Sequence, residues 1–145
     1  MKKLLAVVFS LMLVVALAAC GSSTKADGVY TAQVDAAYAE ANHGWTDTLS
    51  VTYKDGVIVE ATFESYDASG AKKSEASAET YPMTPSPSEW IPQLSENIVT
   101  AGTADKIDGI AGATHASDNA KTLLAAIETE GKVGETITVT VESAE

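Results

Sequence analysis

Four segments of the chain alternate between apolar and polar residues with the two-residue period of half-buried β-strands. They span residues 29–36, 49–54, 57–63 and 136–142. Asp55-Gly56 joins the second segment to the third, and this dipeptide is a strong short-range signal of a β-hairpin. In that hairpin we expect Val51 and Val59 to lie in the core. Glu60 and Glu64 are then expected to face water.

Two further segments have the spacing of amphipathic helices. The apolar positions of the first are Trp90, Leu94 and Ile98, and those of the second are Ala120, Leu123, Leu124 and Ile127. The first segment opens with capping-box spacing between Ser86 and Glu89, but Pro92 would then fall inside the helix. We therefore favour Ser88 as its N-cap, or a turn of tighter helix before the main one.

The second helix is expected over residues 116–130, with Gly131 as its C-terminal stop. The elements thus follow the order strand, hairpin, helix, helix, strand. This order predicts an α+β fold, with an antiparallel β-sheet and two main helices packed on it. Residues 27–145 have the length of one domain.

The first 19 residues have the pattern of a secretory signal peptide. Lys2 and Lys3 precede 16 apolar or small residues, fewer than the roughly 20 that a membrane-spanning helix needs. Residues 17–20, Leu-Ala-Ala-Cys, resemble the lipobox of bacterial lipoproteins, in which the cysteine becomes the lipidated first residue of the mature chain. An uncleaved anchor with an incidental cysteine is the alternative, but Cys20 is the only cysteine and stands where a lipobox requires it. We expect a signal peptide over 1–19, then lipidated Cys20 and a tether over 20–26.

The charge of the chain excludes one large class of partner. Removing the signal peptide takes Lys2 and Lys3 from a formal charge of -11 and leaves -13. All nine basic residues are lysine, so the chain lacks the basic footprint that nucleic acid requires. Acidity also repels the domain from anionic headgroups, so the lipid is expected to hold it to the membrane. One cysteine and two histidines are too few for a Cys-rich zinc site, and we expect no metal.

The segment 108–117 is the best candidate for chemistry. It is rich in Gly and Ala, which lets another group approach the backbone closely. It also leads into a predicted helix N-terminus, where free N–H groups and the helix dipole favour an anion. A phosphate near Thr114 or Ser117 would need no arginine. A plain turn before a helix is the alternative.

Residues 108–114, Asp-Gly-Ile-Ala-Gly-Ala-Thr, resemble the flavinylation motif of the FMN-binding domain family. That motif is Asp, two variable residues, Ser or Thr, Gly, Ala and Thr. The family includes domains of sodium-pumping quinone reductases, the related Rnf complexes and lipid-anchored extracellular electron carriers. Ala111 departs from the Ser or Thr of the motif but leaves the hydroxyl of Thr114 in place. Further similarity to the small lipoprotein branch lies at residues 27–30, 42–45, 54–56, 74–75 and 91–94.

The resemblance implies that Thr114 takes FMN through a phosphoester installed by a flavin transferase. It implies that Asp108 orients the loop or assists the transferase, with a solvated turn residue as the alternative. Gly112 and Ala113, the small residues of the motif, leave room for the flavin and the transferase. His115 is expected to contact the phosphate or the flavin ring, or simply to be exposed.

Three further residues complete the candidate site. Ser117 is expected either to cap the helix or to donate to the phosphate, capping being favoured. In residues 43–45, His-Gly-Trp, Trp45 is expected to stack on the flavin or to lie in the core, and His43 accompanies it.

The function that the resemblance implies is electron transport at the outer face of the bacterial cytoplasmic membrane, or at an outer membrane in a diderm. The partners are then a membrane-bound electron donor or acceptor. An electron carrier is favoured over an enzyme because the sequence offers no evident base, nucleophile or substrate pocket. The alternatives are a module that binds FMN or another phosphorylated ligand reversibly, and a cofactor-free envelope lipoprotein.

Overall fold

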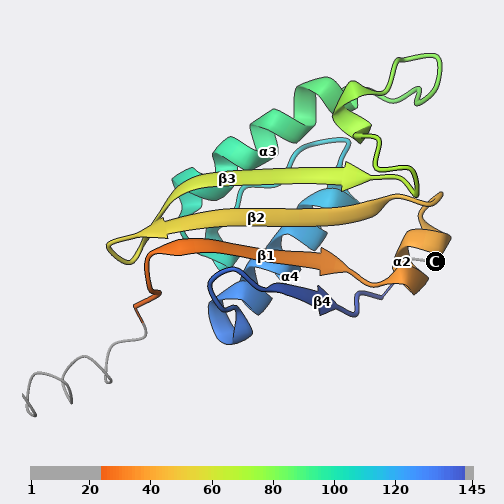
Figure 1. Cartoon of the computed structure of the whole chain (residues 1–145). Helices are drawn as coiled ribbons and strands as arrows, with labels where there is room; N and C mark the ends of the chain where they lie inside the picture. The colour runs from red at the N-terminus through yellow and green to blue at the C-terminus, as the bar shows by residue number, and fades with distance from the viewer. Residues whose placement is uncertain (1–23, 143–145) are drawn as a thin grey trace, which may run out of the picture.

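The computed structural model describes residues 24–142; the predicted signal peptide, Cys20 and the first part of the tether lie outside them. The strands are β1 (Gly28–Val34), β2 (Thr46–Lys54), β3 (Val57–Tyr66) and β4 (Thr136–Val139). The α-helices are α2 (Ala36–Ala41), α3 (Pro87–Ala101) and α4 (Thr114–Glu130), and two short 3-10 helices are η1 (Lys73–Glu75) and η2 (Ala104–Lys106). Figure 1 shows the strands running along the length of the molecule.

The four strands form one sheet in the order β3-β2-β1-β4. β1 and β2 pair antiparallel, as do β2 and β3, but β4 pairs parallel with β1. The predicted α+β fold is confirmed, and the expectation of a wholly antiparallel sheet is wrong for β4. The reason is that α4 runs back along the sheet, so that β4 begins at the end where β1 begins (Figure 1).

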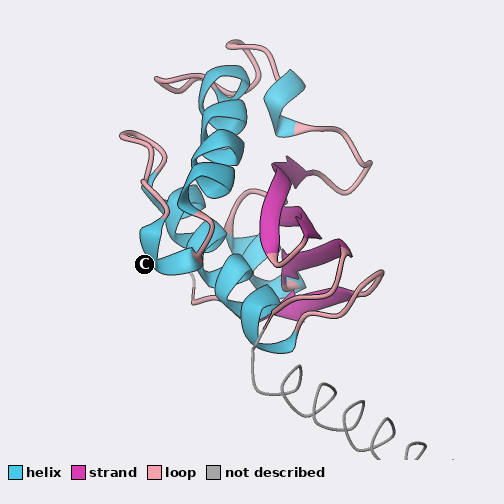
Figure 2. Cartoon of the chain, turned by 90° about the vertical axis from the view of Figure 1, so that its left-hand side faces the viewer, coloured by secondary structure: helices cyan, strands magenta, loops and turns pink. Residues whose placement is uncertain are grey.

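The helices α3 and α4 cover one face of the sheet and leave the other face open (Figure 2). The core lies between the two layers. Its least exposed apolar side chains, each at 3% or less, include Tyr30, Ala32, Val34, Leu49, Val51, Phe63, Trp90, Ile91, Leu94, Ile98, Ala120, Leu123, Leu124 and Ile127. The apolar faces predicted for β1, β2, α3 and α4 are therefore the buried ones.

The predicted face of β3 is wrong at its start because the strand contains a bulge. Thr52 pairs with Glu60 but the next residue, Tyr53, pairs with Ile58, so Val59 is an extra residue. A bulge of this kind reverses which side chains face inward. Ile58 is buried and Val59 is 50% exposed, whereas Glu60 faces water as expected.

Glu64 was expected to face water and is instead 6% exposed. The segment around η1 returns over the end of β3, where Tyr66 forms a bridge with Lys72. The Glu64 carboxylate accepts hydrogen bonds from the amides of Ser65 and Ser74 and from the Ser74 hydroxyl. A carboxylate with three donors is stable where an unpaired one would not be.

Both long helices begin earlier than expected. The N-cap of α3 is Ser86 rather than Ser88: its amide donates to Glu89 Oε2 at 2.9 Å, so Pro92 lies inside the helix. The α4 helix begins at Thr114 rather than at residue 116, and it stops at Gly131 as predicted. Thr114 thus belongs to the helix itself and not to the loop before it.

Candidate phosphate and aromatic-ligand site

A cleft of about 110 Å³ opens at the end of the molecule where α3 and α4 begin and β3 ends, on the right in Figure 1. Its walls come from α2, β2, η1, α3 and the start of α4. The lining residues are Tyr38, Asn42, Asp47, Lys73, Tyr81, Met83, Trp90 and residues 112–116. The fold therefore gathers segments from most of the described chain around the sequence motif.

Thr114 is the first residue of α4 and its side chain is exposed. The first intrahelical bond runs from the Ser117 amide to the Ala113 carbonyl at 3.0 Å. The amides of Thr114, His115 and Ala116 precede that bond, and the first turn carries no acidic residue. This is the arrangement in which a helix N-terminus stabilises an anion, by roughly 0.3–1 kcal/mol at an exposed position.

Ser117 has neither of the roles expected for it. It is 3% exposed, and its hydroxyl donates to the Ala113 carbonyl at 2.8 Å and accepts from the Ile110 amide at 2.9 Å. Because α4 begins at Thr114, Ser117 lies a turn inside the helix and fastens the preceding loop to it. It supports the shape of the site without lining the cleft.

Gly112 is required by the protein's own backbone. Its φ is +87°, and a Cβ there would lie 2.8 Å from the Thr84 carbonyl oxygen and from Pro85 Cδ. The close approach expected at this position therefore exists, but its partner is the 84–85 segment. Ala113 is buried beside it as the N-cap of α4.

Asp108 lies apart from the cleft. It is exposed, and its backbone carbonyl accepts a hydrogen bond from Asn97 Nδ2 at 3.0 Å. It does not line the cleft, unlike His115, which lines it with an exposed side chain. The structure thus brings together three residues of the motif, Gly112, Ala113 and Thr114, with His115 directly after it, whereas Asp108 lies outside the cleft.

Lys73 is a site residue that the sequence did not reveal. It is 6% exposed, and its Nζ lies 4.2 Å from the ring centre of Tyr81, 5.6 Å from Trp45 and 6.0 Å from Trp90. Cation–π contacts of this kind stabilise an ammonium removed from water. Lys73 belongs to a polar segment without periodicity, so no pattern distinguishes it from Lys72.

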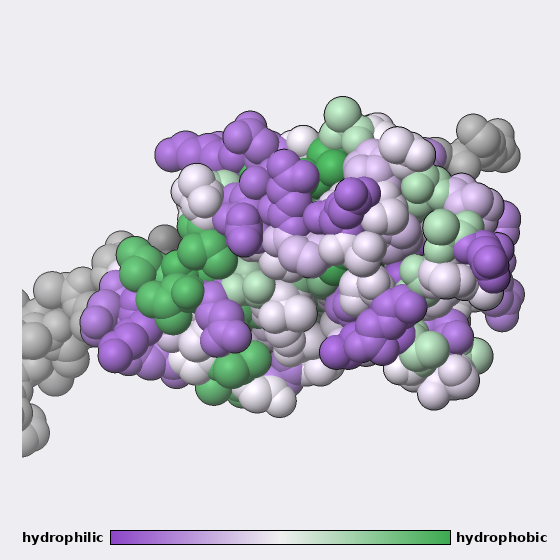
Figure 3. Space-filling view, turned by 90° about the horizontal axis from the view of Figure 1, so that it is seen from above, coloured by the Kyte–Doolittle hydropathy of each residue, from purple (hydrophilic) through white to green (hydrophobic). Residues whose placement is uncertain are grey.

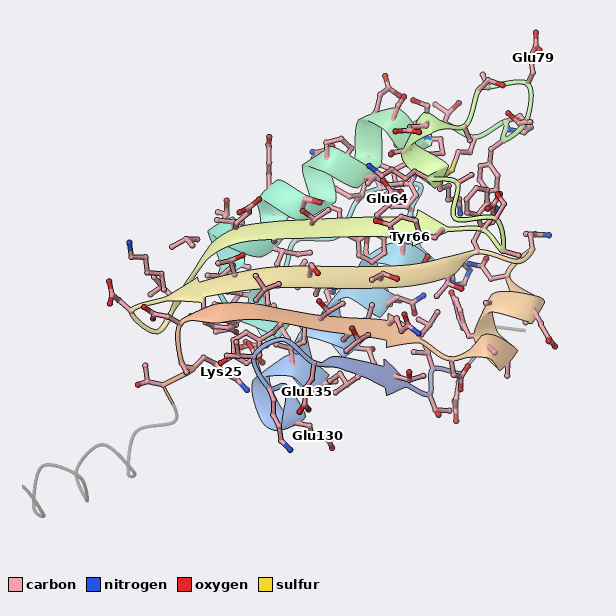
Figure 4. The ribbon with its side chains drawn as sticks, in the orientation of Figure 1. Lys25, Glu64, Tyr66, Glu79, Glu130 and Glu135 are labelled. Carbon is pink, nitrogen blue, oxygen red and sulfur yellow. The ribbon has the colours of Figure 1, made fainter. Side chains whose placement is uncertain are left out.

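The buried Glu64 explains how Lys73 is positioned. Glu64 lies where the end of β3 meets the segment containing η1 (Figure 4), and Ser74 donates to it from both its amide and its hydroxyl. These bonds fasten η1 to the sheet one residue after Lys73. The outer face of β3 thus holds the lysine in the wall of the cleft.

Asp47 also lines the cleft, and both of its carboxylate oxygens accept hydrogen bonds. Asp47 is 2% exposed; its Oδ1 accepts from Ser65 Oγ at 2.5 Å and its Oδ2 from Asn119 Nδ2 at 2.7 Å. Burial raises the pKa of the neighbouring Tyr38. The Tyr38 hydroxyl is therefore protonated at neutral pH.

An open groove of about 590 Å³ adjoins the cleft and shares Tyr81 and Met83 with it. Its lining residues are His43, Trp45, Ala76, Thr80, Tyr81, Pro82 and Met83. Trp45 is half-buried and meets the Tyr81 ring edge-on, with centroids 6.1 Å apart. His43 and Trp45 therefore lie next to the Thr114 cleft, and Trp45 is not a core residue.

Residues 24–142 contain neither a candidate metal site nor a helix that could span a membrane. No group of three or more His, Cys, Asp or Glu side chains there is arranged to hold a metal ion. None of the helices in this part of the chain combines the length and apolar character of a membrane span.

Fold and site together define a small α+β protein with a helix N-terminus and a buried lysine beside an aromatic groove. No protein-family model matches the chain. It resembles the crystal structure of the CPE2226 protein from Clostridium perfringens, with a TM-score of 0.67 and 31% identity, covering 80% of this chain and 98% of that one. The chain therefore belongs to the same family as the CPE2226 protein, whose name states no activity.

Two further similarities are more distant. The 15 kDa lipoprotein of Treponema pallidum (strain Nichols) is 28% identical over 132 residues, which is 88% of this chain and 91% of that protein. A solution structure from Clostridium thermocellum has a TM-score of 0.50 at 19% identity, covering 75% of this chain and 95% of that one. The latter similarity concerns the fold alone.

Proposed function

We propose that this protein is a lipid-anchored, extracytoplasmic FMN-binding electron carrier, with FMN joined by a phosphoester to Thr114. The observation that carries the proposal is the meeting of Thr114 and Lys73 in one cleft. One supplies a hydroxyl at a helix N-terminus, and the other a buried positive charge. The motif at residues 108–114 supports the same assignment.

The cleft suits the phosphate end of FMN. The first amides of α4 and the Lys73 ammonium are both favourable to an anion, and a chain of formal charge -11 otherwise repels one. Asp47 also lines the cleft, but donors occupy both its carboxylate oxygens. The residues that would hold the phosphate are thus Thr114, His115 and Lys73.

The groove beside the cleft suits the flavin ring. Its volume of about 590 Å³ lies within the range of roughly 300–1,000 Å³ usual for small-molecule pockets, whereas the cleft alone is too small. Trp45 and Tyr81 offer aromatic surface, and Met83 a polarizable thioether. His43 stands at the rim with an exposed side chain.

FMN, when bound, supplies one- and two-electron transfer, while the protein supplies its placement and electrostatic surroundings. An open groove leaves a ring accessible to an electron donor or acceptor, which favours a carrier over an enzyme. Attachment of FMN would need a flavin transferase. Electron transport would need a membrane-bound electron donor or acceptor.

Attachment to the membrane through Cys20 is part of the same proposal. It is supported by the Leu-Ala-Ala-Cys sequence at 17–20 and by the similarity to a protein named a lipoprotein. The protein would then lie on the outer face of the cytoplasmic membrane, or on an outer membrane in a diderm. Cys20→Ala is expected to leave an unprocessed precursor or to release the protein into the aqueous fraction.

The decisive experiment is the intact mass of the protein after co-expression with a flavin transferase. The wild type should gain the mass of FMN less one water, because the FMN phosphoryl group replaces the hydroxyl hydrogen of Thr114 while the remainder of an activated flavin donor departs as the leaving group. Thr114→Ala should gain nothing, whereas Thr122→Ala, which removes an exposed threonine from the same helix, should be labelled like the wild type.

The remaining outcomes separate the alternatives. If the wild type is not labelled but Ala111→Ser is, the site is correct and recognition by the transferase is what Ala111 weakens. If neither is labelled and both bind free FMN, the protein is a reversible binding module. If neither binds FMN at all, the flavin proposal is wrong.

A further inference from the structure

The exposed large apolar side chains of residues 24–142 gather at one end of the molecule. They are Val29, Val57, Val59 and Val133, with exposed fractions from 47% to 59%. Val29 begins β1, Val57 and Val59 begin β3, and Val133 occupies the position that a Cβ on Gly28 would take. We call this region the valine end; Figure 3 shows apolar surface concentrated there, at the left of the molecule.

The described chain begins at the same end and is fastened to it. Thr24 packs against Gly56 at the tip of the hairpin. Lys25 Nζ donates to the Gly131 carbonyl at 3.1 Å, and Asp27 Oδ1 accepts from the Asp55 amide at 2.8 Å. From residue 24 onward the chain is therefore part of the folded domain and not of a long tether.

The distance from this end to Cys20 is short. Only four peptide steps separate Cys20 from Thr24. A fully extended chain covers at most about 3.6 Å per residue, so these steps span at most about 14 Å. A lipid on Cys20 thus keeps Thr24, at the valine end, within about 14 Å of the anchored cysteine at the membrane surface.

We propose that the valine end rests on the lipid bilayer and holds the cleft end of the domain away from it; this inference depends on the lipidated Cys20 of the proposed function. Apolar side chains next to a short anchor bury area in the interface at little further entropic cost. The ten-residue strand β3 is about 30 Å long and runs from the valine end to the end of the molecule where the cleft opens, so the cleft lies roughly that far from the bilayer. Redox partners would then meet the flavin in the aqueous space beyond the headgroups.

Charge does not drive this contact. Lys25, Lys54 and Lys132 lie at the valine end, but so do Asp27, Asp55, Glu130 and Glu135. Figure 4 shows Glu79 at the end of the molecule opposite Lys25. Because the two signs are mixed, the contact is apolar, and it is expected on zwitterionic lipid and to persist at high salt.

The test uses the full lipidated protein in phosphatidylcholine vesicles that contain lipids spin-labelled near the glycerol end of the acyl chains. Val57→Cys carries a polarity-sensitive fluorophore, and Glu79→Cys carries the same fluorophore as the matched control. Both positions are exposed, and the acylated Cys20 offers no competing thiol. We expect a blue shift and loss of emission by lipid quenching at 57 and neither at 79, in low and in high salt.

A second variant checks the cause. The double variant Val57→Glu and Val59→Glu should abolish lipid quenching of a fluorophore on Val133→Cys. The matched double variant Val57→Thr and Val59→Thr should largely retain that quenching. Equal emission at 57 and 79 would overturn the proposal, as would a blue shift without quenching, which indicates a second protein copy on the patch. Protein that fails to float with the vesicles refutes the anchor at Cys20 and the membrane contact with it, whereas loss of flavin alone leaves both unaffected.

Discussion

Replacing Lys73 by methionine tests whether the buried cation serves the cofactor or only the fold. Methionine keeps an unbranched apolar stem and removes the ammonium. The matched control is Lys72→Met, because Lys72 is the preceding residue, carries the same charge and is exposed. The two variants have equal net charge. They differ in whether the exposed or the buried lysine loses its ammonium group.

The effect on stability is expected to be small. The variant loses cation–π contacts to Tyr81, Trp45 and Trp90, worth about 0.5–2 kcal/mol together. It also avoids the cost of holding an ammonium away from water, which offsets much of that loss. We expect a change within about 1 kcal/mol, which is about 4 °C in Tm for a domain of this size.

The effect on FMN is expected to be large. A hydrogen bond to a charged group contributes about 1.5–3 kcal/mol, so losing the ammonium should weaken binding about 10- to 150-fold. Lys72→Met should weaken it only through long-range attraction, which salt screens beyond about 10 Å at 0.1 M. At high salt the Lys72 effect should vanish and the Lys73 effect should remain.

The assay is titration of free FMN into protein produced without a flavin transferase, followed by flavin fluorescence or calorimetry. Equal losses for the two variants would mean that Lys73 acts only through net charge. No loss for either would remove Lys73 from the site. A Tm that falls by 10 °C or more would make its role structural.

Three further predictions address the scaffold. Gly112→Ala should destabilise the protein by at least about 1–2 kcal/mol in urea unfolding, because φ is positive and the Cβ meets the 84–85 backbone; no loss would mean that the two segments separate easily. Leu123→Ala should cost about 2–5 kcal/mol by the same measurement, since the side chain is fully buried, and a smaller loss would indicate a core that collapses around the cavity. Hydrogen bonds from the amide and hydroxyl of Ser86 lower the pKa of Glu89, so its stabilisation is present above the usual carboxyl pKa and is lost as pH falls through the lowered value. Glu89→Gln should therefore lower the urea midpoint near neutral pH, and its difference from the wild type should shrink in acid; a difference independent of pH would contradict the linkage.

The local pattern of the sequence was sufficient for most of the scaffold. The apolar faces of β1, β2, α3 and α4 are the buried ones because each element places side chains with a fixed period. The hairpin turn follows from the positive φ of Asp55 and Gly56, which this dipeptide readily adopts. The short motif at 108–114 likewise indicated the segment that lines the cleft, since a helix N-terminus after small residues is a local feature.

Contacts between distant segments decided the rest. The bulge at Val59 reverses a face that alternation alone assigns wrongly, because strand pairing and not the sequence period determines where an extra residue falls. Glu64 is buried since η1 returns over it, and the same contact holds Lys73 in the cleft beside Thr114. β4 is parallel to β1 because α4 carries the chain back along the sheet. In each case the deciding interaction joins residues that are far apart in sequence, and no periodicity of the sequence indicates such a contact. The strands and helices could therefore be predicted from the sequence, whereas the position of the lysine in the site was decided by tertiary packing.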